Sequence, residues 1–197
     1  MQGKIFVVSG PSGSGKSTIT KKVRDLLNIP LSISATSRKA RVGEVDGKDY
    51  YFLDEKEFLE KIEHNEFFEY AKVHNNYYGT LLSVVDKTIK KGQNIILEID
   101  VQGALIAKSK RPDVVLVFCK TENEKTLEKR LRNRKTDSDE VIRLRLENAK
   151  KEMTYEKKYD YVIVNKELDV AIQQLINIIK EETKDEKTKN NSWWISN

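Results

Sequence analysis

The fold of this chain is decided by one stretch, Gly10-Pro11-Ser12-Gly13-Ser14-Gly15-Lys16-Ser17-Thr18. The stretch has the spacing G-x-x-x-x-G-K-S and lies between an apolar run at 4–9, which predicts a buried strand, and a helical pattern at 16–27. In that setting backbone N–H groups surround phosphate oxygens, Lys16 reaches the β and γ phosphates, and Ser17 binds Mg²⁺. The alternative is a glycine-rich turn that fits the pattern by chance. The flanking strand and helix favour a site for a nucleoside triphosphate.

The rest of the chain alternates short apolar runs with amphipathic helical patterns, which is typical of an α/β domain built around a parallel sheet. Core strands are predicted at 4–9, 30–35, 94–99, 114–119 and 160–164. Helices are predicted at 16–27, 55–64, 81–91, 101–109, 122–134, 138–157 and 167–183. The polar residues that follow predict a frayed helix end or a disordered tail.

Residues 36–80 interrupt this alternation. They contain hairpin turn chemistry at Asp46-Gly47, a strand pattern at 67–73 and a turn pattern at 75–79. We therefore predict a small β-rich insert between the two halves of the core, and its polar tips suggest a substrate lobe.

Length and composition suit one domain, because the chain has 197 residues with 34% charged and 38% hydrophobic side chains. No apolar run approaches the roughly 20 residues of a membrane helix, and the first predicted strand starts at residue 4, so we expect neither a membrane partner nor a signal peptide. The single cysteine, Cys119, excludes an internal disulfide and favours a reducing, cytoplasmic location. Its apolar surroundings predict a buried thiol.

The formal net charge of +5 raises nucleic acid as a partner. However, the basic residues occur in separate clusters, at 38–41, at 130–145 and in a Lys-rich C-terminal stretch. Small anionic substrates account for the first two clusters at least as well as a polyanion does, so we predict no nucleic-acid partner.

Arg38 and Arg41 lie three residues apart after a predicted strand and beside several hydroxyl side chains. They suit the capture of a phosphate monoester, because each guanidinium donates in a fork to phosphate oxygens. Tyr50 and Tyr78 offer phenolic donors for the same group. The alternative is that both arginines are solvated surface charges.

Glu69 follows Phe67-Phe68 in a strand pattern, where a carboxylate is unexpected unless it faces solvent or a ligand. Guanine presents two adjacent donors, N1–H and the 2-amino group, which match one carboxylate. Adenine would leave that carboxylate unpaired, at a cost large enough for strong discrimination. The alternative is an outward-facing Glu on an edge strand.

Glu98 and Asp100 end the apolar run at 94–99 and share one side of the predicted strand near its carboxyl end. Ligands bind at that edge of open α/β sheets. An acid there suits the coordination of Mg²⁺ waters. Asp100 also suits the N-cap of the helix predicted at 101, and the two roles are compatible.

Arg130, Arg134 and Arg145 belong to two Arg-rich helical patterns separated by a break at 135–138. Phosphoryl transfer requires positive charge at the moving phosphate, and arginines on a mobile lid supply it. Ser138 is a predicted N-cap for the second helix. The alternative is a basic helical face without a catalytic role.

Together these residues resemble the guanylate kinase family from about Gly3 to Asp169. The resemblance is carried by G-P-S-G-S-G-K-S-T, S-x-T-S-R-x-x-R, G-E-V-D-G-K-D-Y-Y-F, N-Y-Y-G-T, L-E-I-D-V-Q-G-A and R-L-x-x-R…R-L. It implies a P-loop NTPase fold of three layers in one domain, 1–197. The core takes 1–34, 81–124 and 156–184, the GMP-binding lobe 35–80, the helical lid 125–155 and a polar tail 185–197. The implied reaction is ATP + GMP ⇌ ADP + GDP with Mg²⁺.

The resemblance also implies roles for single residues. ATP is expected at residues 10–18 with Arg130 and with Asn165, the last near adenine. The base of GMP is expected to contact Ser34, Glu69 and Thr80. Its phosphate is expected to contact Arg38, Arg41, Tyr50 and Tyr78. Asp100 is expected beside GMP, and Asp100 and Ser17 are the residues expected to bind the metal ion. Lys16, Arg38, Arg134 and Arg145 are the expected catalytic residues.

Two other functions stay open at this point. One is a P-loop kinase for another small molecule, and the other is a guanylate-kinase-like binding module without activity. Such modules typically lose the P-loop lysine and glycines, whereas Gly10, Gly15, Lys16 and Ser17 are all present. We consider dGMP as a second acceptor, and leave open whether the protein is a monomer or a homodimer.

Overall fold

The computed structural model describes residues 2–73, 75–133 and 137–191, and for residues 185–191 it describes the backbone alone. The chain divides into two compact units. The first consists of residues 1–9 and 29–116, and the second of residues 10–28 and 117–197.

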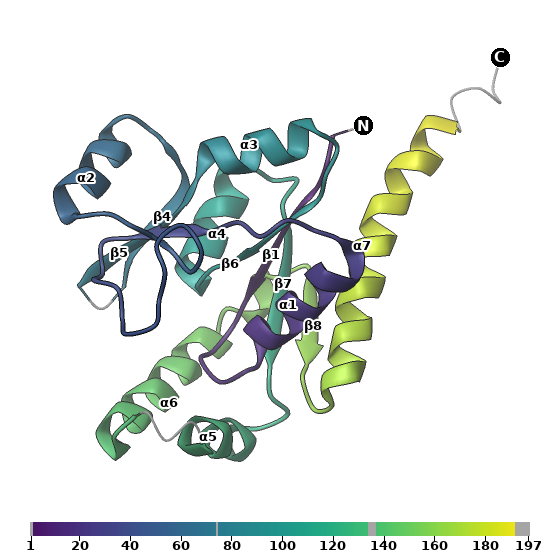
Figure 1. Ribbon diagram of the computed structural model, residues 1–197. Coiled ribbons are helices and arrows are strands. Elements are labelled where there is room, and N and C mark those ends of the chain that lie inside the picture. The colour runs from purple at the N-terminus through teal and green to yellow at the C-terminus, as the bar shows by residue number, and fades with distance from the viewer. Residues whose placement is uncertain (1, 74, 134–136, 192–197) are drawn as a thin grey trace. The chain divides into compact units, whose positions relative to one another are not determined.

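A parallel pair of strands forms the core of the first unit (Figure 1). Strand β1 (Ile5–Ser9) pairs with β6 (Ile95–Glu98). Helices α3 (Leu82–Lys90) and α4 (Val101–Lys110) pack against these strands. Every residue of β1 is buried, which explains why the strand reads as a continuous apolar run, as parallel strands covered by helices do.

A second, four-stranded sheet in the first unit has the order β3-β2-β5-β4. The strands are β2 (Ser34–Thr36), β3 (Tyr51–Phe52), β4 (Phe67–Val73) and β5 (Asn76–Leu81). Helix α2 (Glu55–Glu63) begins at a capping box formed by Asp54 and Glu57. It packs Phe58 against the sheet, with its ring stacked 4.3 Å from that of Phe67, centroid to centroid.

The second unit contains α1 (Lys16–Leu27) packed against α7 (Leu168–Asn191). Strand β7 (Val115–Lys120), which enters this unit at Val117, pairs in parallel with β8 (Tyr161–Val164). A short 3₁₀ helix, η1 (Glu156–Lys158), precedes β8. Cys119 in β7 is fully buried, as the apolar run predicts, and it forms no disulfide within the described residues.

Helices α5 (Glu124–Asn133) and α6 (Asp139–Met153) pack together in the second unit. Their contact is a small apolar cluster of Leu127, Leu131, Ile142 and Ala149. Ser138 caps α6 by accepting a hydrogen bond from the N–H of Val141, so the predicted N-cap is confirmed. Arg134 and residues 135–136 of the predicted break lie outside the described residues.

The predicted α/β class with parallel strands is confirmed, and so is the β-rich insert. The helix predicted at 16–27 has the predicted bounds. The core strand predicted at 30–35 is wrong, because Leu31 forms only an isolated bridge to Ile96 and residues 34–36 belong to the second sheet. Pro30 has no N–H to contribute to a ladder, which shortens any strand there.

The hairpin predicted at Asp46-Gly47 is also wrong. Gly47 does turn the chain, with φ of 71°, but β3 then pairs in parallel with β2. The loop is closed by side chains instead, since Asp46 accepts a hydrogen bond from the N–H of Phe52 and Asp49 accepts one from the N–H of Val45.

Three other boundaries differ from the sequence pattern. The turn predicted at 75–79 is shorter, because β5 begins at Asn76, directly after Asn75 with its φ of 66°. Helix α6 ends at Met153 rather than at 157, and α7 continues to Asn191 rather than ending at 183. The helical residues beyond 183 include three lysines and one glutamate, which are good helix formers, so a polar composition alone does not end a helix. Within the described residues, no helix has the length and apolar character needed to cross a membrane.

Candidate active site

The glycine-rich loop wraps a cavity of about 140 Å³ in the second unit, lined by Ser12, Gly13 and residues 15–18. Gly15 is the N-cap of α1 and lies in the left-handed region, with φ of 93°. A Cβ on Gly10, which has φ of 137°, would lie 2.0 Å from the carbonyl oxygen of Cys119. Glycine is therefore required at both positions by conformation and by space. The cavity at the N-terminus of a helix suits a polyphosphate.

Arg145 of α6 reaches this loop. Its Nη1 donates to Ser12 Oγ at 2.7 Å, and its Nε forms an ion pair with Asp137 Oδ2 at 3.3 Å. The structure thus places an arginine of the segment predicted to form a lid on the glycine-rich loop. The catalytic role of Arg145 stays a prediction, and Arg134 is outside the described residues.

Arg130 and Asn165 contact the loop through one carbonyl group, that of Ser14. Asn165 Nδ2 donates to it at 2.8 Å and Arg130 Nη1 at 3.2 Å. Asn165 is only 3% exposed. Both side chains thus contact the loop that the sequence assigned to ATP. They contact its backbone, at the carbonyl group of Ser14.

In the first unit, Arg38 is held by a carboxylate that sequence reasoning missed. Its Nη1 and Nη2 donate to Glu44 at 2.9 Å each, and the guanidinium carbon lies 5.4 Å from the ring centroid of Tyr50. The hydrogen bonds with Glu44 raise the pKa of Arg38 and, together with the N–H of Arg41, lower the pKa of Glu44. The signal was present in G-E-V-D-G, where Glu44 follows Arg41 closely in the chain.

The other residues predicted to bind a phosphate monoester gather around Arg38 to different degrees. The rings of Tyr50 and Tyr78 lie 6.1 Å apart, centroid to centroid. Burial is the main cause that raises the pKa of Tyr50, so its phenol stays a hydrogen-bond donor at neutral pH. The Arg41 side chain is exposed, and its backbone N–H donates to Glu44 at 2.7 Å. We call Arg38, Arg41, Glu44, Tyr50 and Tyr78 the arginine clamp.

Glu69 is buried, with 3% of its surface exposed, and the alternative of an outward-facing side chain is therefore wrong. Thr80 Oγ1 donates to Glu69 Oε1 at 2.7 Å, and Thr80 pairs with Ser34 across β2 and β5. The three residues predicted to read a base thus lie on neighbouring strands. Burial, more than the nearby Asp100 carboxylate, raises the pKa of Glu69 to about 7, while Thr80 opposes the rise.

Gly103 of α4 makes room for this carboxylate, because a Cβ there would lie 2.5 Å from Glu69 Oε2. The N–H of Gly103 donates to Asp100 Oδ1 at 2.7 Å, so Asp100 does cap α4. Glu98, the second acid of the pair, is exposed at the end of β6.

The two residues predicted to bind a metal ion belong to different units, Asp100 to the first and Ser17 to the second. Ser17 is exposed in the first turn of α1, and Asp100 is half-buried. No cluster of three His, Cys, Asp or Glu side chains within residues 2–73, 75–133 and 137–184 could hold a metal ion. Mg²⁺ in phosphate sites needs only one or two protein oxygens beside substrate phosphates and water, so hydroxyl and carboxylate donors of this kind fit it.

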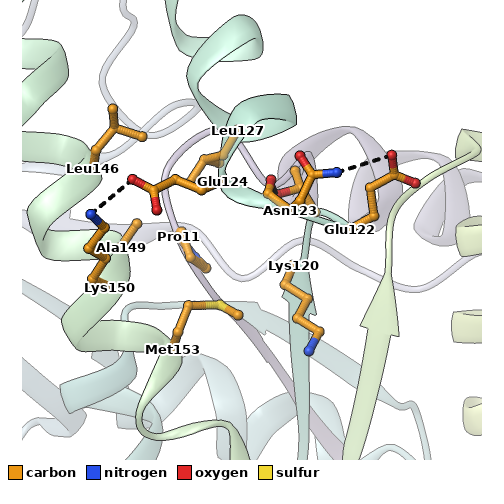
Figure 2. Close-up of a pocket in the computed structure, with 11 residues that line it drawn as sticks. Pro11, Lys120, Glu122, Asn123, Glu124, Leu127, Leu146, Ala149, Lys150 and Met153 are labelled. Carbon is orange, nitrogen blue, oxygen red and sulfur yellow. Dashed lines mark hydrogen bonds and ion pairs between the residues drawn. The ribbon is translucent and has the colours of Figure 1, made fainter.

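A second cavity of the second unit, about 290 Å³, lies beside Pro11 and between α5 and α6 (Figure 2). Its lining includes the apolar side chains of Leu127, Leu146 and Met153. Lys150 and Glu124 form an ion pair of 3.0 Å at its side. The sequence did not indicate this cavity, because only the packing of the two helices brings its lining together.

Comparison with known proteins identifies the family that this chain resembles. The family model described as guanylate kinase matches residues 2–182. The guanylate kinase of Fusobacterium nucleatum is 56% identical over 182 residues, which cover 92% of this chain and 98% of that protein. The guanylate kinase of Thermotoga maritima is 42% identical over 183 residues, which cover 92% of this chain and 88% of that protein. The crystal structure of guanylate kinase from Anaplasma phagocytophilum is similar with a TM-score of 0.75 and 35% identity, covering 92% of this chain and 86% of that one.

Proposed function

The chain belongs to the guanylate kinase family, and from that premise we propose how its residues carry out the reaction. The enzyme transfers the γ-phosphoryl group of ATP to GMP, giving ADP and GDP. The observation that carries the choice of acceptor is the buried carboxylate of Glu69 beside Thr80 and Ser34, a site matched to the two adjacent donors of guanine.

ATP binds with its phosphates in the loop cavity. Backbone N–H groups and the N-terminus of α1 attract the phosphate oxygens, and Lys16 adds a positive charge at the β and γ phosphates. Arg145, which already contacts Ser12, brings a guanidinium to the same loop. These groups oppose the negative charge that builds up on the transferring phosphoryl group.

Ser17 and Asp100 are the residues we propose for Mg²⁺. Ser17 lines the loop cavity, and Asp100 uses Oδ1 for its helix cap, which leaves Oδ2 for a metal-bound water. When bound, Mg²⁺ neutralises charge on the β and γ phosphates.

GMP binds in the first unit through both of its ends. The Glu69 carboxylate accepts from guanine N1–H and the 2-amino group, and it must be ionised to do so. Arg38 and Arg41 of the arginine clamp bind the phosphate, with Tyr50 and Tyr78 adding phenolic donors. Adenine has an acceptor at N1 and no 2-amino group, so AMP would give this buried carboxylate neither of the two donors that guanine supplies.

The chemical step needs no covalent enzyme intermediate. A GMP phosphate oxygen forms a bond to the γ phosphorus while the bond to the β–γ bridging oxygen breaks, and ADP leaves with that oxygen. The protein contributes positioning, charge stabilisation and exclusion of water, which prevents wasteful ATP hydrolysis. The single buried cysteine and the nucleotide substrates favour a cytoplasmic location as part of the proposal.

A coupled ADP-release assay with ATP and Mg²⁺ tests the proposal by comparing GMP, dGMP, AMP, CMP, UMP and dTMP. We expect turnover with GMP, and with dGMP because no contact proposed here involves the ribose 2′-hydroxyl. The variant Glu69→Gln should lose GMP selectivity and keep ATP affinity. Turnover on another acceptor would contradict the base site, and ATP binding without any turnover would favour the binding module.

A further inference from the structure

The carbonyl oxygen of Ser14, inside the glycine-rich loop, accepts hydrogen bonds from three side chains. Asn165 Nδ2 donates at 2.8 Å, Arg130 Nη1 at 3.2 Å and the weaker donor Cys119 Sγ at 3.8 Å. Each donor is more than 100 residues from Ser14 in the sequence. Such convergence on one backbone carbonyl fixes the orientation of its peptide plane.

Asn165 is itself held from both sides of its backbone. Its N–H donates to the carbonyl oxygen of Lys120 at 2.7 Å, and its own carbonyl oxygen accepts from Arg130 Nη2 at 2.8 Å. A Cβ on Gly15 would lie 2.2 Å from Asn165 Nδ2. The glycine therefore leaves the space in which the Asn165 amide reaches the loop.

The orientation of the Ser14 carbonyl determines where the next N–H points. The peptide between Ser14 and Gly15 is trans, so its C=O and N–H point in opposite directions. The loop cavity agrees with this, because Ser12, Gly13 and residues 15–18 line it whereas Ser14 does not. Holding the carbonyl outward thus directs the Gly15 N–H toward the cavity that receives phosphate.

We propose that Asn165 is a positioning residue for the phosphate loop, acting on the polyphosphate through the Ser14–Gly15 peptide rather than on the adenine ring. Arg130 and Cys119 support the same peptide. The inference rests on the proposed function, since it concerns the site at which ATP binds. Asn165 Oδ1 is buried without a hydrogen-bond partner in the described part of the chain. A contact from that oxygen to the nucleoside is therefore the competing role. An experiment must distinguish it from the positioning of the Ser14–Gly15 peptide.

Inorganic tripolyphosphate separates the two roles, because it carries the phosphates of ATP and no base or sugar. Calorimetric affinities for Mg²⁺-ATP and Mg²⁺-tripolyphosphate are measured for the wild-type protein and for Asn165→Ala. The matched control is Asn177→Ala, which removes an exposed amide of α7 that accepts a hydrogen bond from Gln173. We expect Asn165→Ala to weaken both ligands by the same factor, about tenfold for one buried hydrogen bond.

Asn165→Asp sharpens the test, because it replaces the donor with an anionic acceptor facing the Ser14 carbonyl, and it should weaken both ligands further. The backbone amide resonance of Gly15 gives a direct readout. Its shift on addition of tripolyphosphate should be large in the wild-type protein and in Asn177→Ala, and smaller in Asn165→Ala. If Asn165→Ala does not fold, Cys119→Ala should give a smaller loss in the same pattern.

Loss of ATP affinity with unchanged tripolyphosphate affinity would overturn the inference and assign Asn165 to the nucleoside. Unchanged affinity for both ligands would overturn it as well. A wild-type protein that binds tripolyphosphate but not ATP would contradict the proposed function alone, since the loop would still hold phosphate. A wild-type protein that binds neither ligand would contradict both.

Discussion

Glu69 shows how strongly its surroundings change a single side chain. An exposed glutamate is ionised well below neutral pH, whereas burial raises the pKa of this one to about 7, against the opposing effect of the hydrogen bond from Thr80. The free protein therefore holds a carboxyl group that is partly protonated at neutral pH. In the proposed complex guanine supplies two donors to the ionised form, and these donors offset the desolvation of Glu69.

Glu69 should make the ligand-free protein less stable as pH rises. Its pKa is raised from 4.5, the ordinary value, to about 7 on folding. Below pH 4.5 the carboxyl group is protonated in both states, and the ionised form that appears as pH rises through 7 destabilises the folded state. Glu69→Gln removes this charge, and at pH 8.5 it should raise the free energy of unfolding by up to about 3 kcal/mol, whereas at pH 4 the difference should vanish. Urea unfolding at both pH values measures it. Equal stability of the two proteins at pH 8.5 would show that the ionised Glu69 is not destabilising.

Glu44 should act on GMP through Arg38, since it orients both guanidinium nitrogens. Glu44→Gln keeps the shape and removes the charge, so we expect a several-fold rise in KM for GMP with KM for ATP unchanged. Steady-state kinetics with each substrate varied in turn measure both. Glu66→Gln, which breaks a Lys61 ion pair of 2.8 Å in the same unit, is the control and should change neither. Equal changes in both KM values would argue against a specific role for Glu44.

At the scale of elements, the small second sheet brings together the three residues proposed to bind the guanine base. Strands β2, β4 and β5 place Ser34, Glu69 and Thr80 side by side, because β5 pairs with both neighbours. This sheet has its own apolar cluster, in which Phe58 of α2 stacks on Phe67 and Tyr77. The packing of α2 therefore supports the strands that carry the base site.

Phe58→Ala should destabilise this sheet. Phe58 has no exposed surface, and removing a buried aromatic ring typically costs 3–5 kcal/mol, so we expect a loss of about 3 kcal/mol or more in the free energy of unfolding. GMP affinity should fall while ADP affinity is retained. Chemical unfolding and calorimetry measure these quantities. Leu59→Ala, on the exposed side of the same helix, should cost about 0.5 kcal/mol or less, and a similar loss in both variants would contradict the packing argument.

At the scale of the whole molecule, the residues proposed for the two substrates are divided between the two units. Every described residue proposed for the ATP phosphates lies in residues 10–28 or 117–191, and every residue proposed for GMP lies in residues 29–116. Each unit is assembled from two separate stretches of chain. The division follows from tertiary contacts and is not visible as a linker in the sequence.

Each nucleotide should therefore protect its own unit from amide hydrogen exchange. ADP should slow exchange in the loop 10–18 and near Asn165, and GMP should slow it in β2, β4 and β5, because a ligand stabilises the state to which it binds. Exchange measured by mass spectrometry with each ligand alone gives the two patterns. Protection by GMP confined to residues 10–18 would contradict the proposed division.

Local spacing in the sequence was enough to identify the phosphate loop, the bounds of α1, the parallel strands around them and the arginines that the family resemblance assigns to phosphate. These features depend on residues near one another in the chain, and periodicity reports them directly. The pairing of Arg38 with Glu44, the burial of Glu69 against Gly103 and the contact of Asn165 with Ser14 were settled by the tertiary structure. Burial and hydrogen-bond partners depend on which distant segments the fold brings together. The pKa of Glu69 and the orientation of the Ser14 carbonyl depend on those contacts, and no local pattern encodes them.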